Sequence, residues 1–216
     1  MSVKNHKQSQ NNPNALSEKI YSLEDVINSK KLTDDLRVLD CSRPCTGGAS
    51  ILLASENSCK KFTDNPIWIT GIGQKTTSAG FTKNMAFSSM ESTQLAASTA
   101  FKMSKRSVKD IDVAEVHDAF SVCEPMALES LGFTDKGKGM DMVKELYTTN
   151  NLKINPRGGL IGAGHPLGAT GIAQTIEIVQ QLQSCANKRQ VENAKIGLIH
   201  NMSAAATSST VLVLER

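Results

Sequence analysis

From residue 66 to the C-terminus, short β-branched runs alternate with longer segments of helical periodicity. Strands are expected at 66–74, 110–120, 194–202 and 208–216, helices at 91–104, 121–133 and 168–183, and irregular structure at 134–153. The last two strands are expected to form an antiparallel pair. Strands that alternate with helices predict the α/β class, with helices packed on a mixed sheet.

The first 62 residues do not fit this unit. The expected elements are a polar loop or arm at 1–16, a short helix at 22–32 with Ser22 as its N-cap, and strand-like runs at 36–41 and 49–55. These elements are too few to build a separate core. We therefore expect the segment to pack against something else.

Composition excludes several classes of function. The net charge of +3 is spread along the 216 residues without a basic stripe, so a nucleic-acid partner is not expected. No apolar run approaches the roughly 20 residues that span a membrane, and the N-terminus lacks the apolar region of a secretory signal. The five cysteines form no CxxC pair. Free thiols in a cytoplasmic setting are therefore expected.

The stretch NPRGGLIGAGHPLGATG, residues 155–171, contains six glycines and one histidine, His165. So many glycines indicate close backbone approach or sharp turns. A phosphate cradle is one interpretation, but the stretch lacks the Lys-Ser/Thr pair of a P-loop, and Leu167 stands where a third dinucleotide-type glycine would fall. Backbone N–H groups beside a histidine favour acyl chemistry, in which both can hold a developing oxyanion.

Three of the four histidines occupy comparable places in this pattern. His117 follows an expected strand, His165 lies in the glycine loop, and His200 ends another expected strand. Each alone fits an ordinary surface or capping histidine as readily as a functional one. Three at the ends of adjacent elements of one sheet favour a shared site for acid–base work.

Five stretches resemble a known family. They read VKNHKQSQNNPNA, LRVLDCSRPCTGGASILLAS, AEVHDAFSVCEPMALESLGF, NPRGGLIGAGHPLGATGIAQ and IGLIHN. Together they look like the C-terminal half of a thiolase, in the branch of the sterol-carrier-protein-type and archaeal-type thiolases. The resemblance covers nearly the whole chain, in order. Its most specific motif is Gly-His-Pro followed by GATG, and the His-Asp-x-Phe motif marks the branch.

The resemblance implies a thiolase-like fold, in which two similar α/β domains form a five-layer αβαβα sandwich. Residues 1–62 would be the tail of the N-terminal domain with its loop insertion, and residues 63–216 the C-terminal domain. In that family the run at 49–55 belongs to the N-terminal sheet, whose other strands are absent here. A chain of this kind is expected to be an obligate partner in a hetero-oligomer, through an apolar contact above roughly 2,000 Å².

The implied activity is acyl transfer, in which a carbon–carbon bond between acyl groups on coenzyme A is made or broken. The coenzyme A thioester is the substrate, and no cofactor or metal is implied. The nucleophilic cysteine belongs to the N-terminal half, so a separate chain would supply it. By resemblance, His117 helps to polarise the thioester oxygen, and His165 activates the nucleophile and lines the oxyanion hole. Further candidates for the oxyanion site or for support of the two histidines are Gly164, His200, Asn201 and Ser203.

The sequence departs from the family at both places where a second cysteine serves as acid and base. Ala119 stands at the third position of His-Asp-x-Phe, and the C-terminal Cys-x-Gly position reads Asn201–Ser203. Cys123 is expected to be a packing residue rather than a substitute. Proton abstraction would then fall to His117, His200 or a water. The alternatives are a non-catalytic subunit for acyl-CoA binding or assembly, or a retro-aldol relative, with an acyl-CoA-binding OB-fold partner as a further expectation.

Two geometric expectations follow. His117, His165 and Asn201 should converge on one pocket, with Ala119 facing it. The helix at 168–183 should be largely buried, with Ile172, Ala173, Ile176 and Val179 on its buried face.

Overall fold

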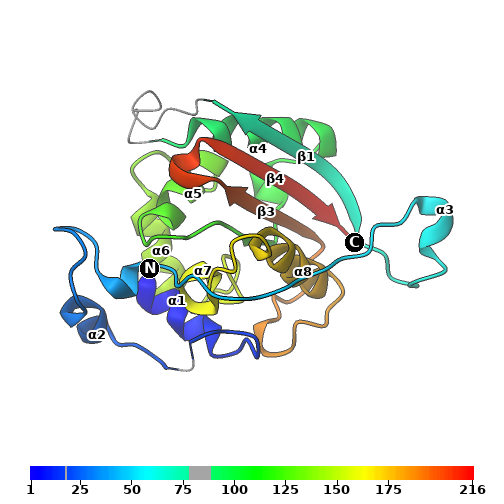
Figure 1. The fold of residues 1–216 in the computed structure, drawn as a ribbon. Helices are drawn as coiled ribbons and strands as arrows, with labels where there is room; N and C mark the ends of the chain where they lie inside the picture. Colours follow the sequence, from blue (N-terminus) through cyan, green and yellow to red (C-terminus); the bar gives the residue numbers. More distant parts are fainter. Residues whose placement is uncertain (18, 78–88) are drawn as a thin grey trace.

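The computed structural model describes residues 1–17, 19–77 and 89–216. The helices are α1 (Ser2–Ser9), α2 (Leu23–Asn28), α3 (Glu56–Cys59), α4 (Glu91–Ser104), α5 (Cys123–Leu131), α6 (Gly139–Thr148), α7 (Gly159–Ala163) and α8 (Thr170–Leu182), and the strands are β1 (Trp68–Thr76), β2 (Val113–Glu115), β3 (Ile196–Met202) and β4 (Ser208–Glu215). Figure 1 shows helices on both sides of the sheet and α3 projecting away from it. Within the described ranges, no helix has the length and apolarity to cross a membrane.

The four strands form one mixed sheet in the order β1-β4-β3-β2. β4 pairs antiparallel with both β1 and β3, while β2 pairs parallel with β3. The α/β class, the mixed sheet and the antiparallel C-terminal pair are therefore confirmed. The helix at α4 has the bounds expected from its periodicity, and α5 ends at Gly132 in the left-handed conformation, as its sequence indicates.

One face of the sheet is covered by α4 and α5 around the larger core cluster. Close packing here depends on small residues. A Cβ on Gly73 of β1 would overlap the carbonyl oxygen of Ala96 in α4, and Ala96 and Ala100 are fully buried. Glycine and alanine therefore bring the helix backbone directly onto the strand.

The other face of the sheet is covered by α8. The prediction of which side of this helix is buried is wrong. Ile172, Ala173, Ile176 and Val179 are only half-buried. The buried side is the opposite one. Beside Ile178 and Leu182 it carries five buried polar residues, Thr170, Gln174, Thr175, Glu177 and Gln181. These polar side chains are buried because partners satisfy them, since Gln174 bonds the carbonyl of His200 and Glu177 pairs with Arg189 at 2.9 Å. The apolar stripe of α8 faces outward.

The N-terminal segment was expected to be a loop or arm, but residues 2–9 form α1. Its inner face carries buried polar groups, among them Lys4 and Asn5, so no apolar period shows in the sequence. α1 packs on α7, where a Cβ on Gly162 would come within 2.5 Å of the carbonyl oxygen of Asn5. Figure 1 shows the two helices side by side. The loop therefore needs glycine at position 162, because the backbone of α1 leaves no room there for a side chain.

Three other expectations differ from the structure. Residues 36–41 contain a 3₁₀ turn at Val38–Asp40 rather than a strand. The run at 49–55 forms no strand and is largely exposed, because no strand in the described part of the chain lies beside it. The charged segment 134–153 holds α6, whose Val143 and Leu146 are buried against the main core. The helix at 22–32 is present as α2, with Ser22 in a capping box.

Candidate active site

His117 and Asn201 lie at the same edge of the sheet because β2 and β3 run parallel. Glu115 is paired with Ile199, so His117, two residues past Glu115, lies level with Asn201, two residues past Ile199. The side chain of His117 is 6% exposed, and Asn201 is half-buried. The parallel pair thus brings two of the expected residues to one place.

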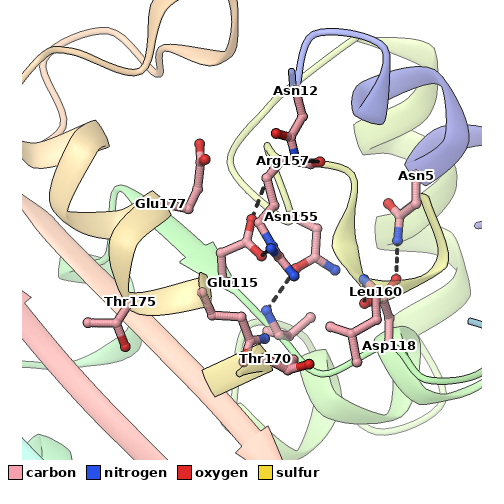
Figure 2. A network of polar contacts seen from close by, with 12 residues as sticks. Asn5, Asn12, Glu115, Asp118, Asn155, Arg157, Leu160, Thr170, Thr175 and Glu177 are labelled. Atoms are coloured by element: carbon pink, nitrogen blue, oxygen red, sulfur yellow. Dashed lines mark hydrogen bonds and ion pairs between the residues drawn. The ribbon is translucent and has the colours of Figure 1, made fainter. Parts of the chain in front are cut away.

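The glycine loop is fixed beneath this edge by Asp118. Its buried carboxylate accepts the backbone N–H of Leu160 at 2.6 Å, at the first turn of α7. A Cβ on Gly159 would collide with the same carboxylate, which explains the glycine there. Asn5 of α1 donates to Asp118 at 2.7 Å from the other side, as Figure 2 shows. The carboxylate therefore joins three segments of the chain.

Buried ion pairs hold the start of the loop. Arg157 pairs with Glu115 of β2 at 3.0 Å, and the side-chain amide of Asn155 accepts the N–H of Val116 at 2.8 Å (Figure 2). Lys4 reaches Glu124 of α5 at 2.7 Å. Burial raises the pKa of Glu115, and the positive charge of the neighbouring Arg157 opposes that rise and favours the ionised carboxylate. Each charge is buried beside a partner, so removal of one partner would leave the other uncompensated.

His165 is positioned by a sharp turn and two hydrogen bonds. Gly164 has φ +97°, and its ideal Cβ would come within 3.0 Å of the Cys45 sulfur, so a side chain at this turn is strained. The backbone N–H of His165 donates to the carbonyl of Arg43 at 2.9 Å. Its ring Nδ1 lies 2.7 Å from Oγ1 of Thr170.

The contact with Thr170 bears on the tautomer of His165. When the single hydroxyl proton of Thr170 goes to the carbonyl of Pro166, 3.0 Å away, Nδ1 of His165 is the donor in the other bond. Desolvation lowers the pKa of His165, with a smaller contribution from the positive charge of Arg157. The neutral ring then carries a lone pair on Nε2, which has no hydrogen-bond partner among the described residues. This is the form that accepts a proton.

The two motif histidines form a pair over one cavity. Their ring centroids lie 5.1 Å apart, edge to face. Desolvation lowers the pKa of His117 to about 4, with a smaller contribution from His165. The cavity has a volume of about 770 Å³ and is lined by both rings and Asn201. Its apolar lining includes Met90, Phe120, Met126, Leu167 and Met202. The arrangement presents two neutral imidazoles to a largely apolar space suited to an acyl group.

The other candidate residues take different places. Asn201 lines the cavity and donates to Gln174 at 2.8 Å. Ser203 lines it too, but its hydroxyl bonds within the turn, since it accepts the N–H of Ser208 at 2.9 Å. His200 is fully buried behind the cavity, where its Nε2 lies 3.0 Å from Oγ1 of Thr93. Gly164 acts through the backbone of His165.

Ala119 lines the cavity where the resemblance would place a second thiol, and Cys123 lines it one turn later in the chain. Burial raises the pKa of the Cys123 thiol to about 11. Cys123 therefore stays protonated near neutral pH and is no ready proton acceptor there. Asp118 and Thr170 were not expected in supporting roles, although both lie inside the motifs, one residue after His117 and five after His165.

The mixed sheet, with helices on both faces and a glycine loop at its edge, defines an α/β domain of the thiolase-like type. A family model described as "Thiolase C-terminal domain-like" matches residues 73–216. The chain belongs to this family, and the resemblance drawn from its motifs is confirmed.

Several curated proteins resemble the chain along its length. An acetyl-CoA acetyltransferase from Methanothermobacter thermautotrophicus is 39% identical over 218 residues, which cover 100% of this chain and 57% of that protein. Sterol carrier protein 2 from Gallus gallus is 39% identical over 206 residues, covering 92% of this chain and 38% of that protein. The chain thus spans about half the length or less of these relatives.

Among solved structures, the Ltp2-ChsH2(DUF35) aldolase superposes with a TM-score of 0.81 over 99% of this chain and 56% of that one, at 19% sequence identity. At this identity the likeness concerns the fold alone, and it supports the thiolase-like architecture.

Proposed function

We propose that this chain is the C-terminal half of a thiolase-type acyltransferase that acts on acyl-CoA thioesters. The observation that carries the proposal is the pair of neutral histidines, 5.1 Å apart, over one apolar cavity. The nucleophilic cysteine comes from an N-terminal half on a separate polypeptide. The acetyl-CoA acetyltransferase relative supports a thioester substrate for the whole enzyme. The five free cysteines support a reducing, cytoplasmic setting.

In this proposal His165 activates the nucleophile. Nε2 of His165 takes the proton of the incoming cysteine, and the resulting thiolate attacks the carbonyl carbon of the thioester. The carbon–sulfur bond to coenzyme A breaks, and the proton on His165 passes to the departing thiolate. The tautomer in which Nδ1 donates to Thr170 leaves Nε2 free for this transfer. His117 and Asn201 line the same cavity and contact the acyl group there.

Exposed apolar surface supports a large partner. Leu52 and Leu53 are 68% and 70% exposed, and they border a groove with Trp68, Ile176 and Val179. This groove includes the outward stripe of α8. We assign residues 1–62 to the tail of the N-terminal domain and residues 63–216 to the C-terminal domain, so that the partner covers this groove. An apolar surface of this extent on one side of the molecule is typical of an interaction site.

The test is co-expression with a cysteine-bearing thiolase N-terminal half, followed by thiolysis of acetoacetyl-CoA by the purified complex. Thr170→Val should lower kcat about 10–100-fold, because the tautomer of His165 is released, and Thr170→Ser should retain most activity. A complex without thiolysis activity, or a Thr170→Val complex as active as the Thr170→Ser one, would contradict the proposal.

A second candidate function rests on Ala119. Without a thiol at this position, the cavity suits retro-aldol cleavage of a β-hydroxyacyl-CoA, or binding of an acyl-CoA without catalysis, with an OB-fold protein as partner. The same complex, offered a 3-hydroxyacyl-CoA and assayed for release of a ketone or aldehyde, separates these outcomes. Carbonyl release without thiolysis favours the aldolase, and saturable binding without turnover favours the binding subunit.

A further inference from the structure

Two successive turns of α8 hold two residues that line the cavity. Oγ1 of Thr170 lies 2.7 Å from Nδ1 of His165. One turn later, Oε1 of Gln174 accepts the side-chain N–H of Asn201 at 2.8 Å. Thr170 and Gln174 are both fully buried, and at a spacing of four residues they lie on the same side of the helix. The polar side of α8 therefore positions side chains of the cavity wall.

The orientation of two amide groups follows from one backbone carbonyl. Nε2 of Gln174 donates to the carbonyl oxygen of His200 at 3.3 Å, and that oxygen can only accept. Oε1 of Gln174 is then the end that faces Asn201, so the nitrogen Nδ2 of Asn201 faces Gln174. The reverse orientation would set two oxygens against each other where water has no access, since Gln174 is 0% exposed.

The oxygen of the Asn201 amide lies at the other end of the group and is open. A Cβ on Gly171 of α8 would lie 3.8 Å from Cγ and Nδ2 of Asn201, while Oδ1 is farther than 4 Å from that position. Oδ1 accepts no hydrogen bond from the described residues, and unlike Nδ1 of His117 it is not sealed from solvent. Because Asn201 lines the cavity, Oδ1 is an acceptor available to a ligand there.

We propose that Gln174 is a positioning residue that turns the oxygen of the Asn201 amide toward the cavity, where this oxygen accepts a hydrogen bond from a hydroxyl group on the acyl chain of the substrate. Asn201 is then an acceptor rather than a donor to an oxyanion, which is one of the roles for which the sequence made it a candidate. The inference rests on the proposed binding of acyl-CoA thioesters, and it deepens that proposal because it names a hydroxyacyl thioester as the preferred substrate class.

An accessible amide oxygen discriminates between acyl groups of similar size. A 3-hydroxyacyl chain has an O–H to donate to Oδ1 of Asn201, whereas a 3-oxoacyl chain presents another oxygen to it and a saturated chain leaves it unpaired. His117 lies level with Asn201, so the hydroxyl that Asn201 meets is close to the thioester group. Met126 and Met202 contribute to the apolar wall around the rest of the chain. This substrate class favours cleavage of a β-hydroxyacyl-CoA over thiolysis.

The experiment measures binding of thioesters to the full chain in complex with its N-terminal half, whose nucleophilic cysteine is replaced by alanine to prevent acyl transfer. The ligands are the two enantiomers of 3-hydroxybutyryl-CoA, acetoacetyl-CoA and butyryl-CoA, and isothermal titration gives their dissociation constants. One enantiomer of 3-hydroxybutyryl-CoA should bind at least about 10-fold more tightly than acetoacetyl-CoA and butyryl-CoA. Asn201→Leu removes the acceptor, so this preference should fall below about 2-fold.

Gln174→Met tests the positioning role, because methionine fills a similar space without holding the amide of Asn201. The preference for the hydroxyacyl thioester should fall to about 3-fold or less, although Asn201 is still present. Gln181→Met is the matched control. Gln181 is equally buried on α8 and donates to the carbonyl of Arg189 at 2.7 Å, but it does not line the cavity. This variant should lose stability and keep the preference.

The side-chain amide of Asn201 gives a second readout in ¹H–¹⁵N spectra, where its signals are assigned by their loss in Asn201→Leu. These signals should shift in Gln174→Met and stay in place in Gln181→Met. Equal wild-type affinities for the hydroxyacyl and butyryl thioesters, or a preference that survives Gln174→Met, overturn the inference while acyl-CoA binding itself stands. A complex that binds none of the thioesters would instead count against the proposed function.

Discussion

The carboxylate of Asp118 accepts the backbone N–H of Leu160 at 2.6 Å, and so joins the segment that carries His117 to the segment that carries His165. The two motifs are more than forty residues apart in the sequence, and this hydrogen bond holds them next to each other in the fold. The carboxylate is also at the first turn of α7, where a negative charge is favoured. Support for the candidate site therefore comes from inside the motifs themselves.

Asp118→Ala should destabilise the protein by about 2–4 kcal/mol, because it leaves the buried N–H of Leu160 and one of the two N–H groups of the Asn5 amide without their acceptor. Urea unfolding, followed by circular dichroism, measures the change. The control is Asp141→Ala, since that carboxylate is 73% exposed and its loss should change stability by less than about 0.5 kcal/mol. Equal effects of the two substitutions would contradict the role of Asp118.

Two glycines of the same loop should respond in opposite ways to alanine. Gly164→Ala places a Cβ at φ +97° and against the Cys45 sulfur, so we expect a loss of roughly 1–3 kcal/mol and a displaced His165. At Gly168 a Cβ meets nothing within 4 Å and φ is not positive, so Gly168→Ala should be neutral or slightly stabilising. Thermal melting of both variants checks the pair, and a reversed order would refute the account of the turn.

The segments with regular hydrophobic periodicity predict most of the fold, because the side chains that they bury are apolar and recur at the spacing of a strand or a helix. β-branched runs at β1, β3 and β4 pair with one another, and α4 carries small apolar residues at helical spacing on its buried side. In such segments the local pattern and the tertiary contacts agree.

The pattern fails where polar groups are buried. α1 hides Lys4 and Asn5 because Glu124 and Asp118, far away in sequence, pair with them. No period of apolar residues can reveal such a helix, since its partners are specific groups rather than a general apolar core. On α8 the buried side is polar for the same reason, so the apolar period identified the outward side.

The candidate site was half predictable. The sequence pattern places His117 at a strand end and His165 in the glycine loop, and the two rings meet at one edge of the sheet. The orientation of the His165 ring depends on Thr170, whose hydroxyl meets Nδ1 through a contact within the folded loop. A hydroxyl in a sequence does not show which acceptor it meets.

His200 should make stability fall in acid. Its folded-state pKa of about 3 lies below the ordinary value of 6.5, so the native state binds fewer protons than the unfolded state between those values. This contribution is fully present above pH 6.5 and is lost progressively as the pH falls toward 3. His200→Gln removes it, so the stability difference between wild type and variant should shrink by about 1–3 kcal/mol from pH 7.5 to pH 4.5. Urea titrations at both pH values measure the difference, and parallel pH profiles would contradict the neutral, buried ring.

The exposed apolar segment beside α8 should decide association with the N-terminal half. Leu52 and Leu53 are 68% and 70% exposed, so a double substitution to aspartate should leave the fold intact and raise the solubility of the chain expressed alone. The same change buries two charges in the proposed interface, so it should weaken binding to the co-expressed half at least 100-fold. Leu95→Asp is the matched control, since Leu95 is 44% exposed on α4, across the sheet from α8.

Co-purification and isothermal titration measure binding of the chain to the co-expressed half. A double variant that binds as tightly as the Leu95→Asp control would place the partner elsewhere, and a wild-type chain that is a soluble monomer with a cooperative melt would remove the need for a partner.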